Sequence, residues 1–414
     1  MPRSFAPYRA GRRRWLGVLA GMGVVAVALA ALLLARAPAT AEPSPSPTPP
    51  AATGSPTGAP TPTPTVGASP LPSPTPTLAP HEPGAVAATT NGVLVPWAER
   101  ERATRHPIAV IIDDHPDARP QSGLASADIV YQALAEGGVP RYLAVFQAGD
   151  AEAVGPVRSS RFYFVAWAAE WRALLAHVGG APNSLAYLRR IDGRLVWNAD
   201  EFRWGGRAGY FWRIRQRLSP HNVYSSTSRL RELAERLGAT APVSGSPWTF
   251  TVETPRARRP SGGSLVIPYA WNRVSYRYDA ASNRYLRSVT REGRQVDAGS
   301  ERRVAPANVI VLFMRTGRLS DSGPGSTNEA KGRLELAFTG TGRALVLRNG
   351  EVVSAVWSKK DDAAPTLLRY PRGHRLAGLP VPLVRGQIYV QVVPLSLPVS
   401  VRRGTPAPTL VDPR

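Results

Sequence analysis

The sequence contains no cysteine, and this absence excludes several ways of stabilising or anchoring a protein. Disulfide bonds and thiolate zinc sites are ruled out, so a folded part outside the cytoplasm must be held together by its packed core. A lipid anchor at a signal-cleavage site is also ruled out, because a cysteine has to carry the lipid.

Lysine is scarce as well, since only Lys331, Lys359 and Lys360 occur, and arginine supplies nearly all of the positive charge. The formal net charge is +22; residues 1–86 contribute +4 (six Arg minus two Glu), which leaves about +18 for the rest. A GC-rich genome explains arginine in place of lysine but not the excess of bases over acids. Such a charge attracts polyanions, and we expect an anionic cell-envelope polymer rather than nucleic acid, for which the sequence shows no recognition module.

One long apolar stretch lies near the N-terminus, where Trp15–Ala35 are 21 uncharged, mostly apolar residues directly after Arg12–Arg14. At about 1.5 Å per helical residue they span a hydrocarbon core of roughly 30 Å. Basic residues favour the cytoplasmic side, so the sequence predicts a cytoplasmic head over 1–14 and a single-pass signal anchor in the cell membrane over 15–35. The bulk of the chain is then extracytoplasmic. A signal peptide cleaved after Ala39–Ala41 is the alternative, with the same destination.

Residues 36–94 have the composition of a disordered linker. Between Ala37 and Gly92 lie 16 of the 42 prolines, among Thr, Ser and Ala and with only two acidic residues. Repeated proline favours extended polyproline II conformations, and such a segment cannot bury a core. The roughly 320 residues beyond it suffice for two domains.

Hydrophobic patterns predict a mixed α/β domain over 95–245. Short apolar runs predict strands at 108–112, 127–136, 141–147 and 174–178. A period of 3.6 predicts one helix from Phe162, with Ser159 or Ser160 as its N-cap. A second helix is expected around 230–237, with Gly238 as its stop signal.

The helical period disappears after Gly238, which predicts a β-rich domain over 246–400 and a tail over 401–414. The overall class is α+β. Asn349-Gly350 is typical of a type I′ hairpin turn. Whether the two domains share one sheet stays open. Strands are expected at 249–253, 264–268, 273–278, 285–290, 309–314, 334–339, 344–348, 352–357 and 388–393.

The strongest local site signal is GPVRSSR at residues 155–161, directly before the first predicted helix. A helix N-terminus presents unpaired N–H groups and a partial positive charge, so it attracts anions. Arg158, Ser159, Ser160 and Arg161 are therefore expected to hold a phosphate or carboxylate. The alternative is an ordinary serine cap beside two solvated arginines.

Two further histidines lie next to Gly- or Pro-bearing loops. His177 ends a predicted strand in HVGGAP, and His221 lies in SPHNVY. Each is a candidate general base or ligand donor. Glu136 is a candidate acid, or a partner for Arg141.

His115 follows two aspartates at the end of the first predicted strand. Carboxylates beside an imidazole suit a divalent metal, but adjacent strand residues point to opposite faces, so Asp113 and Asp114 need not cooperate. We therefore keep His115 as a ligand-binding candidate, with turn chemistry before Pro116 as its alternative, and expect no metal or cofactor.

The order of these motifs resembles the YerB-like family of bacterial envelope proteins. HPIAVIIDDHPDARPQSGLASADIVYQALAEGGVPRYLAVFQ is followed by GPVRSSR, HVGGAP and SPHNVY, and later by NVIVLF, WSK and GQIYVQVVP. The resemblance covers about 105–394 and implies an exported two-part protein without an established reaction. Typical relatives are lipoproteins, whereas this chain has Trp15–Ala35 in place of the lipid-accepting cysteine. Relatives also often carry Asn where this chain has Asp114.

Taken together, these features predict a membrane-anchored envelope protein whose first domain binds an anionic ligand. The alternative is a hydrolase or transferase acting on wall glycan or a phosphate-linked polymer, with His177 or His221 as base and Glu136 as acid. Loops positioned by a scaffold are where sites usually lie. We therefore expect Arg158, His177 and His221 to line one cleft at an end of the first domain's sheet.

Overall fold

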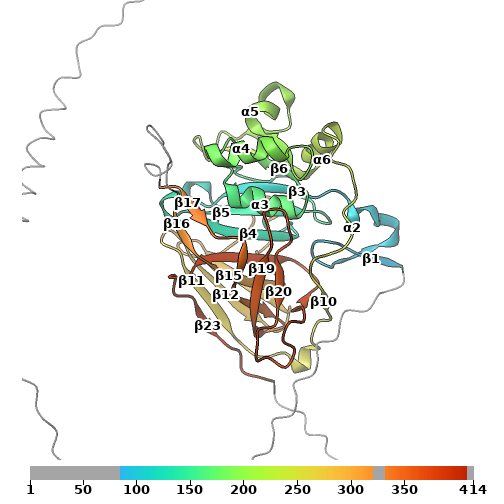
Figure 1. The fold of residues 1–414 in the computed structure, drawn as a ribbon, viewed down its shortest axis with the longest axis vertical. Helices are drawn as coiled ribbons and strands as arrows, with labels where there is room; N and C mark the ends of the chain where they lie inside the picture. Colours follow the sequence, from blue (N-terminus) through green and yellow to red (C-terminus); the bar gives the residue numbers. More distant parts are fainter. Residues whose placement is uncertain (1–83, 320–331, 408–414) are drawn as a thin grey trace, which may run out of the picture. The chain divides into compact units, whose positions relative to one another are not determined.

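The computed structural model describes residues 84–319 and 332–407 (Figure 1). The predicted anchor over 15–35 and most of the predicted linker lie outside these ranges. The folded part begins inside the predicted linker, because β1 (Ala85–Ala87) pairs with β2 (Leu94–Pro96). Among the described residues, none of the helices combines the length and the apolar character needed to cross a bilayer. The described chain is mostly β-structure with few helices.

A ten-stranded mixed sheet takes strands from both halves of the sequence, residues 84–245 and 246–407 (Figure 1). Its order is β20-β19-β18-β15-β22-β4-β5-β3-β6-β7. The halves join where β22 pairs in parallel with β4, so they share one sheet. The first half supplies β3 (Ile108–Asp113), β4 (Ile129–Leu134), β5 (Pro140–Phe146), β6 (Leu174–His177) and β7 (Trp197–Asp200). The second half supplies β15 (Asn308–Met314), β18 (Gly340–Arg348), β19 (Glu351–Lys359), β20 (Leu367–Arg369) and β22 (Ile388–Pro394).

The central strands are continuous apolar runs because both of their faces are covered. On one face, α3 (Phe162–Glu170) and α4 (Pro182–Ile191) pack over Ala109 and Ile111 of β3. On the other face, α6 (Thr227–Arg236) packs over Val110 and its neighbours. Figure 1 shows these three helices gathered around β3, β5 and β6.

A second, five-stranded sheet covers the latter face beside α6. Its longer strands alternate buried and partly exposed residues, as antiparallel strands with one solvated face do. Its strands, in spatial order, are β14 (Gly293–Arg294), β13 (Arg284–Val289), β12 (Arg273–Asp279), β11 (Ser264–Pro268) and β23 (Ser400–Arg402).

Short elements complete the fold. The small helices are α2 (Glu101–Thr104) and α5 (Glu201–Trp204). The remaining short strands are β8 (Trp212–Arg213), β9 (Val223–Tyr224), β10 (Phe250–Thr251), β16 (Thr316–Arg318), β17 (Leu334–Leu336) and β21 (Leu383–Val384).

Each strand predicted from the sequence has a counterpart, and no α-helix follows α6 in the described part of the chain. Asn349 (φ 49°) and Gly350 (φ 77°) both have the positive φ that a type I′ turn requires. One helix was missed, and one helix cap was predicted wrongly. Helix α4 was not expected, because its single apolar face is short and follows a Gly-Gly turn. Helix α3 has Arg161 in its N-cap position and no capping side chain, so neither Ser159 nor Ser160 caps it.

Candidate functional site

The segment 154–161 brings three of the predicted motifs together at the C-terminal end of β3. Arg158 donates its backbone N–H to Ile111 O of β3 (2.8 Å), and Val157 donates to Val223 O of SPHNVY (2.7 Å). In return, Val178 of HVGGAP donates to Arg158 O (3.1 Å). GPVRSSR therefore lies between HVGGAP and SPHNVY as an irregular strand, although the three segments are far apart in sequence.

Asp113 organises the side chains at this point. Its buried Oδ2 accepts a hydrogen bond from His221 Nδ1 at 2.7 Å and lies 2.9 Å from Arg158 Nε. The arginine contact is an ion pair rather than an aligned hydrogen bond. Asp113 Oδ1 accepts from the backbone N–H of His115. Because the carboxylate holds Nδ1–H of His221, it fixes the tautomer in which Nε2 carries the lone pair.

An aromatic wall borders this aspartate. The rings of His115 and His221 are stacked, with centroids 4.7 Å apart and 17° between their planes. Trp271, from the turn before β12, is half exposed and lies 6.2 Å from the His115 ring. The Trp271 indole N–H donates to Gly137 O at 2.7 Å. His115 also accepts the backbone N–H of Asp117, so it performs the expected turn role while it faces His221.

Arginines surround Glu136 immediately beside this group. Its carboxylate forms ion pairs with Arg161, with Arg141 (3.5 Å) and with Arg333 (3.5 Å). Arg141 is also the register partner of Asp113 across β3 and β5, so the two carboxylate groups are neighbours. The carboxylates of Asp113 and Glu136 are therefore surrounded by four arginines, namely Arg141, Arg158, Arg161 and Arg333.

Burial and the neighbouring charges shift the pKa values of Glu136 and Arg141. Burial raises the pKa of Glu136, but the charges of Arg161 and Arg141 lower it more, so the pKa lies below its ordinary value. Burial lowers the pKa of Arg141 to about 10, and the like charge of Arg161 adds to this shift. Glu136 therefore stays ionised at neutral pH and is a weak proton donor.

The other candidates in the predicted set have structural contacts. His177 is fully buried; its Nδ1 lies 2.8 Å from Gly179 O and its Nε2 lies 2.7 Å from Asn198 Oδ1. Both nitrogens are thus used in holding the turn after β6. Ser160 is buried, and its hydroxyl bonds that of Ser184 at 2.7 Å. Ser159 is partly exposed, and its carbonyl oxygen accepts from Arg141 at 2.8 Å.

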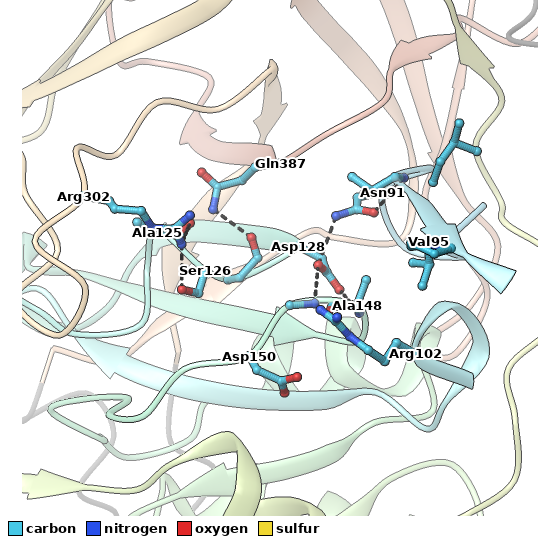
Figure 2. A pocket seen from close by; sticks show the side chains of 15 residues that line it. Asn91, Val95, Arg102, Ala125, Ser126, Asp128, Ala148, Asp150, Arg302 and Gln387 are labelled. Carbon is cyan, nitrogen blue, oxygen red and sulfur yellow. Dashed lines mark hydrogen bonds between the residues drawn. The ribbon is translucent and has the colours of Figure 1, made fainter. Parts of the chain in front are cut away.

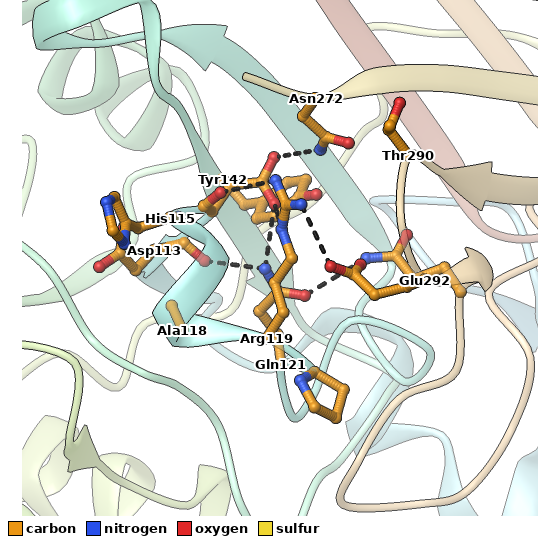
Figure 3. Close-up of polar contacts among 12 residues, drawn as sticks. Asp113, His115, Ala118, Arg119, Gln121, Tyr142, Asn272, Thr290 and Glu292 are labelled. Carbon is orange, nitrogen blue, oxygen red and sulfur yellow. Dashed lines mark hydrogen bonds and ion pairs between the residues drawn. The ribbon is translucent and has the colours of Figure 1, made fainter. Parts of the chain in front are cut away.

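Asp114 points to the opposite face of β3, as strand alternation predicts. Its carboxylate accepts hydrogen bonds from Arg119 (3.0 Å) and Asn272 (2.8 Å), two residues labelled in Figure 3. It also accepts hydrogen bonds from the side chains of Gln121 and Gln132. Arg119 in turn pairs with Glu292 at 3.2 Å. A carboxylate with this many donors is a structural group, and it ties the second half of the chain to β3.

A cavity of about 400 Å³ lies at the other end of these strands (Figure 2). In the register, Ile108 pairs with Phe146 at this end, whereas Asp113 pairs with Arg141 at the other. The buried carboxylate of Asp128 lines the cavity and accepts hydrogen bonds from Asn91 and from the backbone of Gln147 and its neighbours. None of the residues predicted from the sequence as a site lines this cavity.

Two features of the site escaped sequence reasoning. Trp271 follows a strand with no local pattern that marks it, and only the tertiary fold brings it to His115. The orienting role of Asp113 was also missed, because its partners lie 45 and 108 residues away.

Among the described residues, His115, Asp117 and His221 also form a group that offers three donor atoms within 4.8 Å of one another.

Two family models match this chain: "Protein of unknown function (DUF3048) N-terminal domain" over residues 95–240, and the corresponding C-terminal domain over 265–390. The "Putative lipoprotein YerB" of Bacillus subtilis (strain 168) is 28% identical over 304 residues, which cover 72% of this chain and 83% of the relative. The crystal structure of YerB from Bacillus subtilis matches with a TM-score of 0.65 at 27% identity, covering 77% of this chain and 100% of that one. The resemblance predicted from the motif order is thereby confirmed.

Proposed function

This chain belongs to the YerB-like family, and from that premise we propose that it is an extracytoplasmic cell-envelope protein that binds an anionic ligand at the end of β3. The relative named as a lipoprotein supports the location. Here the apolar segment 15–35 takes the place of the lipid as a single-pass anchor in the cytoplasmic membrane. The ligand is an envelope polymer that carries phosphate or carboxylate groups.

The observation that carries the ligand proposal is the charge around Asp113 and Glu136. Three arginines, Arg141, Arg158 and Arg161, face these two carboxylates, and Arg333 also pairs with Glu136, so the group carries more positive than negative charge. Arg141 and Arg161 are each more than nine-tenths buried. Buried charge is costly unless it is compensated, and guanidinium groups match phosphate and carboxylate geometry. Arg158 is the most exposed of the three and is the group we assign to the ligand.

The test compares two arginine variants for binding to a purified phosphate-linked wall polymer. The full chain in detergent should bind it with an affinity that falls steeply with added salt. Arg158→Gln should weaken binding about 10- to 100-fold, the loss of one charged hydrogen-bonding group. Arg372→Gln removes the same charge from an exposed loop beyond β20 and serves as the control. If both variants lose the same amount of polymer affinity, the interaction is an unspecific attraction between charges.

A hydrolase or transferase is the second candidate, and the Asp113–His221 pair favours it. A carboxylate that orients a histidine leaves the other ring nitrogen able to take a proton from water or a hydroxyl. Glu136 is poorly suited to the acid role, because its arginine partners keep it ionised. On this reading His221→Ala keeps polymer affinity but abolishes the release of fragments, which chromatography of the incubated polymer would detect. Unchanged polymer after incubation with the unaltered protein argues for binding alone.

A further inference from the structure

We propose that His115, Asp117 and His221 form a binding site for one divalent first-row transition-metal ion. Each residue offers one donor atom, and the three atoms lie within 4.8 Å of one another. Two imidazoles and one carboxylate are a donor set that suits Zn²⁺, Mn²⁺ or Fe²⁺, whereas Mg²⁺ and Ca²⁺ prefer oxygen ligands throughout. Three protein ligands leave further coordination positions for water or for an anion.

Asp113 supplies the second observation that points to a metal. A metal-binding histidine usually donates its other ring N–H to a carboxylate, which fixes the tautomer and makes the ligand more basic. The 2.7 Å contact between His221 Nδ1 and the buried Asp113 is of this kind. It leaves Nε2 of His221 to coordinate the ion, so the orienting contact is already built into the fold.

The other two ligands have the freedom to close on the ion. With metal–nitrogen bonds of about 2.0–2.1 Å, neighbouring donors in a tetrahedral zinc site lie about 3.3 Å apart. The three donor atoms, within 4.8 Å here, therefore have to approach one another by at most about 1.5 Å. The side chains of His115 and Asp117 are 32% and 73% exposed, so both can rotate without disturbing the core. The bond from the Asp117 N–H to His115 Nδ1 is long, at 3.3 Å, and opposes this movement weakly.

Arg158 pairs with Asp113 beside the proposed metal site but is not one of its ligands. Its positive charge disfavours a cation nearby, so Arg158→Gln should leave metal affinity unchanged or make it tighter. The metal proposal does not rest on anion binding, because the metal alone tests it.

The experiment is a calorimetric titration of Zn²⁺ alone into the full chain, prepared without a polyhistidine tag, treated with chelator and kept in a phosphate-free buffer. One saturable site per chain is expected. His221→Ala and His115→Ala should each lower zinc affinity by about 100-fold or more, and Asp113→Asn by about 10- to 100-fold through the lost orientation. Replacement of Zn²⁺ by Co²⁺ should give visible absorption bands of a nitrogen- and oxygen-ligated ion, which these variants lose.

His374→Ala is the matched control. His374 is exposed and, like His115, accepts a backbone N–H two residues ahead (from Leu376, 3.1 Å) and stacks on an aromatic ring, that of Tyr370 at 4.5 Å. Its removal should leave zinc binding unchanged. If a histidine variant unfolds, Asp117→Asn decides, because this exposed side chain is dispensable for the core and should still cost about tenfold in affinity.

Equal zinc affinity in His221→Ala and His374→Ala would overturn the proposal, and so would the lack of a saturable site in the unaltered chain. Arg158→Gln separates the two proposals. If it loses polymer binding and keeps zinc, both proposals stand. If the unaltered chain binds zinc at this site but never binds the polymer, only the proposed function fails.

Discussion

Replacing Lys359 with methionine should destabilise this protein far more than the same change at the adjacent Lys360. Lys359 lies on β19 in the second half of the chain, and its Nζ pairs with Glu170 Oε2 at 2.9 Å. Glu170 ends α3 in the first half, and both side chains are almost fully buried. Glu170 also accepts hydrogen bonds from Thr366 and Tyr131. Lys360, by contrast, is exposed.

The magnitude follows from the uncompensated charge that the substitution leaves behind. Breaking a buried ion pair by removing one partner costs about 3–5 kcal/mol of unfolding free energy. Thr366 and Tyr131 still donate to Glu170, so we expect a loss of about 3 kcal/mol, near the lower end of that range. For a folded part of this size such a loss lowers the melting temperature by roughly 4–5 °C. Lys360→Met should change the unfolding free energy by less than about 0.5 kcal/mol.

Urea unfolding followed by tryptophan fluorescence measures both variants. The double variant Glu170→Gln with Lys359→Met should recover much of the stability, because replacing a whole buried pair is often nearly neutral. A loss in Lys359→Met no greater than in Lys360→Met would refute the reasoning. So would a double variant as unstable as Lys359→Met alone, since the cost would then not come from the stranded carboxylate.

Three further outcomes are expected. Burial lowers the pKa of His106, so the unfolded chain takes up a proton near pH 6.5 before the folded chain does. The unfolding free energy should therefore fall as the pH drops below about 6.5. In urea melts between pH 7 and 5, His106→Asn should reduce this dependence of the unfolding free energy on pH. An unchanged dependence would contradict the assignment to His106. Gly350→Ala should lower the melting temperature more than Gly373→Ala. Both glycines have positive φ, but only at Gly350 would the new Cβ meet another side chain, that of Tyr278 at 2.5 Å. Equal losses of melting temperature would mean that the Tyr278 ring moves aside. Protease added to intact protoplasts should digest everything beyond the linker, and survival of the C-terminal half would disprove the outward topology.

Local patterns predicted most of the elements of this fold but not their neighbours. The run of apolar residues in β22 predicts a buried strand. Nothing in this run specifies that the strand pairs with β4, which lies some 260 residues earlier in the sequence. Hydrophobic alternation encodes which face of a strand is buried and leaves the partner strand open. For that reason the two halves could be separated in the sequence, while their common sheet could not be foreseen.

The same limit applies to the site. The order of GPVRSSR, HVGGAP and SPHNVY allowed us to expect their convergence, and backbone hydrogen bonds join these segments. Which side chains face the common space depends on orientation, which a motif does not encode. The ring of His177 bonds to Gly179 and Asn198, while His221 and Arg158 meet on Asp113.

The two aspartates at the end of β3 have different roles, because successive strand residues point to opposite faces of the sheet. Asp113 faces the candidate site and holds His221, whereas Asp114 faces the second half and accepts from Asn272. The residue before Asn272 is Trp271, which lies against His115. The turn before β12 therefore contributes both to the wall of the site and to the contact that fixes this turn on β3. Because one turn does both, the second half of the chain is needed to shape a site whose polar groups come mostly from the first.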